Sequence, residues 1–190
     1  MKAIKLSAVL LAIGLFTAAA SQASAQTYKV DPVHSTLIFR IHHLDAGYIW
    51  GRFNDPTGQF TLDTDDPSKD TFNASVPAKN IDTHIDMRDR DLRGENWLNV
   101  KQYPTITFKS TSVKKTDDTH LEVTGDLTLH GTTKSVTAAV EITGTGKGMQ
   151  GETRRGIEAT FTINRHDFGI NGKGAGDEVK LVAALEGIQQ

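Results

Sequence analysis

Histidines are the residues of this chain best suited to chemistry, because an imidazole binds metals and changes its charge near neutral pH. Three of the seven, His34, His42 and His43, lie in the stretch DPVHSTLIFRIHHLDAGYIWGRF at 31–53. Two histidines of one strand can share a metal when they are two residues apart, because side chains alternate between the faces of a strand. No pair among the three has that spacing, so a metal site would have to be assembled from several strands.

His43 is the histidine whose position carries the most information. Alternation places it on the same face as Leu37, Phe39 and Ile41, whereas His42 points to the opposite face. A single histidine on an apolar face is most often a hydrogen-bonded core residue. The two alternatives are a metal ligand and a contact with the polar end of a bound molecule.

The sequence contains no recognisable catalytic constellation. It has no G-x-S-x-G nucleophile elbow, and its carboxylates fall mostly in predicted turns or in one predicted helix. The absence of cysteine excludes a thiol nucleophile, a zinc-thiolate site and a disulfide framework. We therefore expect a binding protein rather than an enzyme, with no cofactor and no resident metal.

Two stretches have the composition of ligand loops but differ from them in detail. The segment GINGKGAG at 169–176 lacks the Gly-Lys-Ser/Thr ending of a phosphate loop and precedes a predicted strand, whereas phosphates bind at helix N-termini. The aspartates between 63 and 70 suggest calcium, but an EF-hand loop needs an oxygen ligand and then glycine where this chain has Pro67 and Ser68. These aspartates indicate a solvated turn.

The first 25 residues have the pattern of a secretory signal peptide. MKAIK supplies two lysines, LSAVLLAIGLFTAAA is an uncharged apolar run, and ASA at 23–25 fits a cleavage site after Ala25. The alternative is a transmembrane anchor, but the run is shorter than the ~20 residues that span a bilayer. We expect residues 26–190 to form a single periplasmic domain without a membrane anchor.

The charge balance argues against nucleic acid as a partner. The chain has 21 basic and 23 acidic residues, and removal of Lys2 and Lys5 makes the mature domain more acidic. Binding to phosphates requires a basic surface.

Most of the mature chain alternates with a period of two, which predicts strands with one buried face. The alternating segments are 35–43, 72–76, 106–108, 121–129, 136–142, 159–163 and 179–185. The last segment also fits a short helix, although its alternation and the preceding glycines favour a strand. Turns are predicted at 55–58, 66–67, 117–118, 131–132 and 144–151. About eight antiparallel strands with one apolar face are expected to close into a barrel, because closure removes the edges.

One segment departs from this alternation and predicts a short helix. Asp82 or Thr83 would cap it, and Gly94 would end it. Within it, Asp86 with Arg90 and Asp89 with Arg93 would form acid-first pairs four residues apart. Its apolar stripe is thin, so we expect the helix to lie against the sheet with much of its surface in water.

Several motifs together resemble the YceI family of exported, lipocalin-like proteins. They are DPVHSTLIFRIHHL with WGRF at 50–53, then DMRDRDLRGENWLNVKQYPTITFKS, GDLTLHGTTKSVT and INRHDFGI. They follow the family's order and cover nearly all of the mature chain. The segment 97–100, Trp-Leu-Asn-Val, replaces the family's usual Phe-Phe-Asp-Val, which keeps an apolar pair and could change the shape of the pocket.

The resemblance implies an all-β fold, an eight-stranded antiparallel lipocalin-like β-barrel with one short helix. It also implies that the interior holds a long apolar chain, typically a polyisoprenoid such as the tail of a quinone or its precursor. Several inward positions are small, which would leave room for such a chain: Ala74, Val76, Val123, Gly125, Ala138, Ala159 and Ala183.

On this hypothesis the protein carries or sequesters an isoprenoid lipid, and the alternation nominates the residues that contact it. The apolar candidates are Leu37, Phe39, Ile41, Phe53, Phe60, Ile106, Phe108, Leu127, Leu129, Phe161, Ile163 and Leu181. His43 and Arg165 are candidates for the polar end of the ligand, and Trp97 or Tyr103 for the rim. Plain core packing is the alternative for each apolar member.

Two hypotheses of other classes remain open at this stage. In one, histidines from several strands converge on a metal in a redox-associated protein. In the other, the barrel is filled by its own side chains and serves as an interaction module, with a homodimer as one form. A long-chain lipid in the purified protein would favour the carrier, stoichiometric metal would favour the metal-binding protein, and an empty small cavity would favour the filled module.

Overall fold

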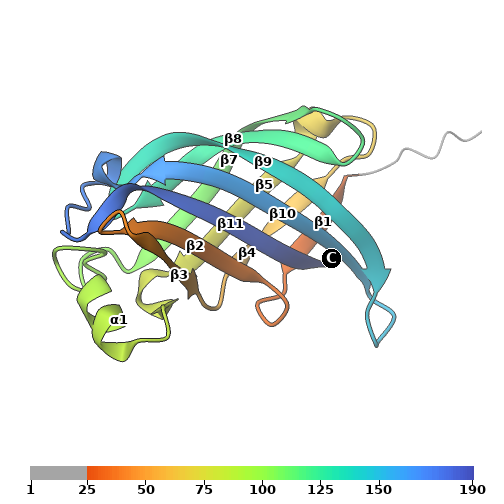
Figure 1. Cartoon of the computed structure of the whole chain (residues 1–190). Coiled ribbons are helices and arrows are strands. Elements are labelled where there is room, and N and C mark those ends of the chain that lie inside the picture. Colours follow the sequence, from red (N-terminus) through yellow and green to blue (C-terminus); the bar gives the residue numbers. More distant parts are fainter. Residues whose placement is uncertain (1–24) are drawn as a thin grey trace, which may run out of the picture.

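The computed structural model describes residues 25–190, whose strands form one closed antiparallel barrel (Figure 1). The strands are β1 (Gln26–Val30), β2 (Thr36–His43), β3 (Gly47–Phe53), β4 (Thr57–Leu62), β5 (Thr71–Pro77), β6 (Ile81–Asp82), β7 (Thr105–Lys115), β8 (His120–Leu129), β9 (Thr132–Lys147), β10 (Thr153–Asn164) and β11 (Ala175–Gln189). Within residues 25–190, the single α-helix is α1 (Asp86–Leu92), and three short 3-10 turns lie at Pro67–Lys69, Ala78–Asn80 and Arg165–Phe168.

The barrel closes because the last strand pairs with both of the first two. β1 pairs with the end of β11 at 187–189, and β2 pairs with its earlier part at 175–184. β1 and β2 thus follow one another along β11, separated by residues 31–35. β4 and β3 pair with them in the same order, and β5 and β6 come next. The eleven segments therefore occupy eight positions around the barrel, which confirms the predicted fold class.

Two clusters of buried apolar side chains line the two halves of the barrel. One lies toward β1 and the β9–β10 turn, and the other lies toward α1, which caps the opposite end in Figure 1. The buried members of the first are Tyr28, Val30, Phe60, Leu62, Phe72, Val113, Leu121, Val123, Ala138, Val140 and Ile157. Those of the second are Phe39, Phe53, Val76, Ile81, Leu98, Leu127, Leu129, Ile163, Phe168 and Ile170.

Some inward glycines make room for aromatic rings rather than for open space. A Cβ at Gly125 would lie 2.5 Å from the ring of Phe108, and a Cβ at Gly187 would lie 2.7 Å from the ring of Phe60. The expectation that Gly125 leaves room for a ligand is therefore wrong, because Phe108 occupies that room.

The predicted helix exists, but its predicted cap is wrong. α1 begins after Ile85, which has extended backbone and provides no side-chain cap. Asp82 and Thr83 cannot cap it because the chain is still extended at 81–82, where β6 pairs with the end of β3. Asp89 and Arg93 bind groups of the preceding segment rather than each other: Asp89 accepts from Thr83, and Arg93 donates to the carbonyls of Lys79 and Ile81.

Two further expectations can be compared with the strands. The segment 179–185 lies inside β11, so it is a strand and not a helix. The turn predicted at 144–151 is shorter than expected, because β9 continues through Gly144 and Gly146 to Lys147. The signal-peptide prediction falls almost entirely outside the described residues. Within residues 25–190, no helix has the length and apolar character needed to cross a bilayer.

The packing of the Phe108 ring against Gly125 can be tested by adding a side chain at position 125. Gly125→Val is expected to lower the free energy of unfolding by about 1–3 kcal/mol, since its Cβ would also lie 2.6 Å from the carbonyl oxygen of Lys109. Gly146→Val is the matched control, because nothing lies within 4 Å of a Cβ there. Urea unfolding of both variants measures the difference, and equal stabilities would contradict the packing described here.

Candidate functional site: an apolar cavity in the barrel

A cavity of about 680 Å³ runs through the barrel and is lined by members of both apolar clusters. It contacts fifteen of the sixteen residues nominated from the sequence. They are Leu37, Phe39, Ile41, His43, Phe53, Phe60, Trp97, Ile106, Phe108, Leu127, Leu129, Phe161, Ile163, Arg165 and Leu181. The volume lies within the range of small-molecule sites, and it does not fit a barrel filled by its own side chains.

Small residues on neighbouring strands line part of the cavity. Ala159 of β10 is directly opposite Ala183 of β11, and both line the cavity. Ala74 of β5 and Ala138 of β9 line it from the other strands. Because inward side chains alternate with outward ones along every strand, alanine at these positions keeps the interior wide without breaking the ladder.

Tyr103 is the nominated residue that does not line the cavity. Its ring packs against His130, with centroids 4.6 Å apart in an edge-on arrangement, and it covers Gly131 in the β8–β9 turn. Of the two residues nominated for the rim, Trp97 lines the cavity and Tyr103 packs on this turn instead.

Three segments frame the mouth of the cavity at the α1 end. The β2–β3 hairpin contributes His43 and Ile49, and α1 contributes Met87. The segment after β10 contributes Arg165 and Lys173. His43 is exposed here rather than enclosed in the core, so it lies where the polar end of an inserted molecule would meet water.

α1 is fixed at the mouth by polar contacts with the segment that precedes it. The carboxylate of Asp89, which is buried, accepts from the backbone N–H of Thr83 at 2.9 Å and from its hydroxyl at 2.5 Å. Arg88 donates to the hydroxyl and the carbonyl of the same residue, both at 2.7 Å. These bonds place Met87, Arg88 and Asp91 beside the cavity.

Arg165 holds together the loop that forms one side of the mouth. It is only 5% exposed, and its guanidinium donates to the carbonyls of Ile170, Ala175 and Gly176 at 2.8–3.0 Å. Its charge also lies 5.4 Å from the centre of the Trp97 ring, within cation–π range. Arg165 thus closes the loop 169–176 on itself and joins it to the segment after α1.

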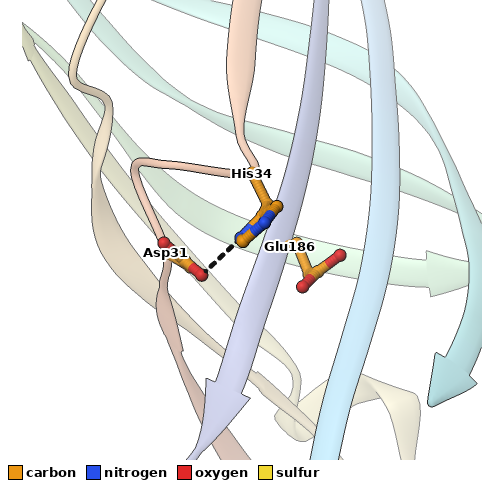
Figure 2. A group of neighbouring side chains, drawn as sticks. All are labelled: Asp31, His34 and Glu186. Carbon is orange, nitrogen blue, oxygen red and sulfur yellow. Dashed lines mark hydrogen bonds and ion pairs between the residues drawn. The ribbon is translucent and has the colours of Figure 1, made fainter. Parts of the chain in front are cut away.

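The described residues contain one group of three potential metal ligands, Asp31, His34 and Glu186, at the end of the barrel away from α1 (Figure 2). Nη1 of Arg154 donates to Asp31 at 2.9 Å and also to Glu186, so a guanidinium already neutralises these carboxylates. The group contains a single histidine. Over residues 25–190 no group of three ligands contains two histidines, so the geometry does not favour the hypothesis of converging histidines.

This cluster lowers the pKa of Asp31 from its ordinary value of 3.8 to about 2. The main cause is the hydrogen bond from His34 at 2.8 Å, followed by the backbone N–H of Val33 and by Arg154. Because Asp31 lies in the connection between β1 and β2, the cluster ties that connection to β10 and β11.

The aspartates between β4 and β5 are also structural, although the expectation of a solvated turn is only partly right. Asp63 and Asp70 are buried, and both carboxylates accept backbone hydrogen bonds. Asp70 accepts from the N–H of Asp63, and Asp63 accepts from those of Asp65 and Asp66. Burial raises the pKa of Asp70 to about 6.

With the fold and the cavity described, comparison with known proteins places the chain. Residues 28–187 match the model of the YceI-like domain. The chain belongs to the YceI family. A UPF0312 protein of Pseudomonas aeruginosa is 41% identical over 189 aligned residues, which cover 97% of both chains.

Two solved structures have the same fold as this YceI-family chain at low identity. BcnA of Burkholderia cenocepacia aligns with a TM-score of 0.75 and 21% identity, over 83% of this chain and 98% of its own. A domain of Saccharophagus degradans, described as polyisoprenoid binding and implicated in plant cell wall breakdown, aligns with a TM-score of 0.63 and 15% identity, over 86% and 98%.

Several lining residues of this YceI-family member were not predicted from its sequence. Ile49 could have been found, because it alternates with the exposed Tyr48 and Trp50 in β3. Arg88 and Lys173 carry no such signal, since they reach the cavity only through the positions of a short helix and a loop. In the segment where this chain departs from the family's usual residues, Trp97 lines the cavity and Leu98 is buried in the core.

The role of Arg165 in framing the mouth can be tested by removing its charge. Arg165→Met is expected to lower the free energy of unfolding by about 2–4 kcal/mol, because three carbonyls lose a charged donor. Proteolysis within 169–174 should become faster. Arg90→Met, on the exposed face of α1, is the control and should change stability by less than about 0.5 kcal/mol. Similar behaviour of the two variants would contradict the assignment.

The ion-pair cluster predicts a pH-dependent contribution to stability. The pKa of Asp31 is lowered in the folded state, so its contribution is present above its ordinary value of 3.8 and is lost as the pH falls toward 2. Asp31→Asn should therefore destabilise by about 1 kcal/mol at neutral pH, after allowance for solvent screening, and progressively less in acid. Thermal unfolding between neutral pH and pH 2 measures this. A difference that stays constant with pH, or one shared by the exposed control Asp118→Asn, would contradict it.

Proposed function

We propose that this protein holds a long-chain isoprenoid lipid in its barrel and carries or sequesters it in the periplasm. The observation that carries the proposal is the continuous apolar cavity of about 680 Å³ between the two core clusters. Its wall is mostly aliphatic and aromatic. The charged side chains Arg88, Asp91 and Lys173 lie at the mouth together with His43, and neutral polar residues of β4, β5 and β7 also line the cavity.

Hydrophobic transfer accounts for both the strength and the breadth of such binding. Burial of each methylene group contributes about 0.8 kcal/mol, so each isoprene unit supplies a few kcal/mol. An apolar wall distinguishes poorly between chains of similar shape, because it offers few directional contacts. The polar groups at the mouth are therefore the part of the site able to select a quinone or precursor head group.

The family relationship supports the same class of ligand. The structurally similar domain from Saccharophagus degradans is described as polyisoprenoid binding, and it shares the barrel. A non-catalytic role agrees with a wall that presents packing surfaces rather than reacting groups. The leader expected at residues 1–25 supports a periplasmic location, with cleavage after Ala25.

Native mass spectrometry of protein isolated from its own periplasm tests the proposal directly. A stoichiometric apolar adduct is expected, and organic extraction after denaturation should release an isoprenoid. A native mass equal to that of the bare mature chain, together with no uptake of a polyprenol from detergent, would contradict the carrier function.

Narrowing the cavity should abolish the adduct while the barrel stays folded. Ala159→Trp is the sharper variant, because Ala159 lines the cavity and is only partly buried, whereas Ala138 is 3% exposed and tightly packed. Thr162→Trp, at an exposed position of the same strand, is the matched control and should keep its lipid. Retention of full-length lipid by Ala159→Trp with a normal circular dichroism spectrum would show that this position does not face the ligand.

A further inference from the structure

Exposed apolar side chains gather around the mouth of the cavity. Seven large hydrophobic residues of the described chain are exposed, and five of them lie on the β2–β3 hairpin or at the start of α1. They are Leu44 (69% exposed), Tyr48 (49%), Trp50 (55%), Ile85 (50%) and Met87 (70%), and we call them the mouth patch. The other two, Val33 and Met149, lie in connections at the opposite end of the barrel.

The mouth patch is continuous with the cavity wall. Tyr48 and Trp50 flank Ile49 on β3, and Ile49 lines the cavity. Leu44 follows directly after His43, another lining residue. Met87 belongs to both surfaces, since it lines the cavity while 70% of it is exposed.

The sheet is open beside this patch. β3 pairs with β2 along its whole length, but on its other side, within the described part of the chain, only Arg52 and Phe53 pair, with β6. Residues 47–51 therefore form a free edge, and α1 rather than a strand completes the wall there. A chain entering the cavity between this edge and α1 would pass over the mouth patch.

The hairpin and the helix that carry the patch have balanced charges. Arg40 lies over the rings of Tyr48 and Trp50, with its guanidinium carbon 4.3 and 5.8 Å from their centroids. The hairpin at 36–53 and the helix at 86–92 together carry four arginines and four aspartates. A partner that binds this surface is therefore expected to be recognised by apolar contact and aromatic anchoring, with little contribution from net charge.

From this continuity and balance we infer that the mouth patch docks on the surface of a lipid bilayer, with Leu44, Trp50 and Ile85 inserted among the lipids. The inference rests on the proposed function, because a molecule that fits an apolar cavity of this size resides in membranes and not in water. Direct contact between the mouth and the bilayer spares such a chain the passage through water, which costs about 0.8 kcal/mol per methylene. Tryptophan and tyrosine favour the interface, where their rings meet both apolar and polar surroundings.

A triple variant, Leu44→Asn, Trp50→Thr and Ile85→Ser, removes three of the five members of the mouth patch and changes no residue that lines the cavity. Each change suits its local backbone. Leu44 has a φ of 49°, which asparagine tolerates well, and Ile85 is the helix N-cap, a position that serine favours. Threonine suits an exposed strand position. The control is Val33→Ser with Met149→Ser, which removes the exposed apolar residues at the opposite end.

Binding to vesicles of phosphatidylcholine and phosphatidylethanolamine, without isoprenoid, is measured by flotation of the delipidated protein. The unmodified protein and the control should bind alike and with little dependence on salt. The triple variant should bind at least about tenfold more weakly, a difference of about 1.4 kcal/mol or more. It should also take up a polyprenol more slowly from vesicles while retaining normal uptake from detergent.

The outcomes separate this inference from the proposed function. Equal vesicle binding by the triple variant and the unmodified protein would overturn the docking surface, whatever the cavity holds. Absence of vesicle binding by the unmodified protein, together with a dimer in sedimentation that the triple variant loses, would show that the patch is a self-interface and would also overturn it. Failure of polyprenol uptake from detergent by every variant would refute the proposed cargo, while flotation would still decide the docking.

Discussion

The closed alternation of the barrel is the constraint on which the rest of the structure depends. Once β11 pairs with β1 and β2 on one side and with β10 on the other, every second residue must point into one shared space. The size of those inward residues then decides whether the interior is a solid core or a cavity. The paired alanines Ala159 and Ala183, on neighbouring strands, keep part of the interior open. Aromatic rings packed over glycines, such as Phe108 over Gly125, fill the space elsewhere.

Polar groups hold the two ends of this apolar interior by different means. At the mouth, Arg165 and Asp89 are both buried: Arg165 binds carbonyls of the loop that follows it, and Asp89 binds Thr83 in the segment before α1. At the other end, Arg154 gathers carboxylates from the β1–β2 connection and from β11. Hydrogen bonds and ion pairs thus position irregular backbone that apolar packing alone would leave undefined.

The sequence was sufficient for seven of the strands and for most of the cavity wall, because these follow from a period of two, but it did not predict β1, β3, β4 or β6. Phe39, Phe161 and Leu181 line the cavity as alternation predicted. The sequence was insufficient where the position of a residue depends on a partner that is distant along the chain. Tyr103 is drawn to the β8–β9 turn, and the start of α1 is delayed because β6 must first pair with β3. Nor does any local pattern reveal that Arg154 sits among carboxylates more than thirty residues away in either direction.

The pairing of β1 with the end of β11 has a consequence for how the protein folds. Tyr28 lies opposite Gln189, so the seam joins the first and the last strand of the barrel. The enclosed space cannot exist until the last strand has been synthesised and has paired with the first, and contacts of such long range form slowly. The apolar inner face is unprotected until then, so a molecule bound inside has to enter the closed barrel.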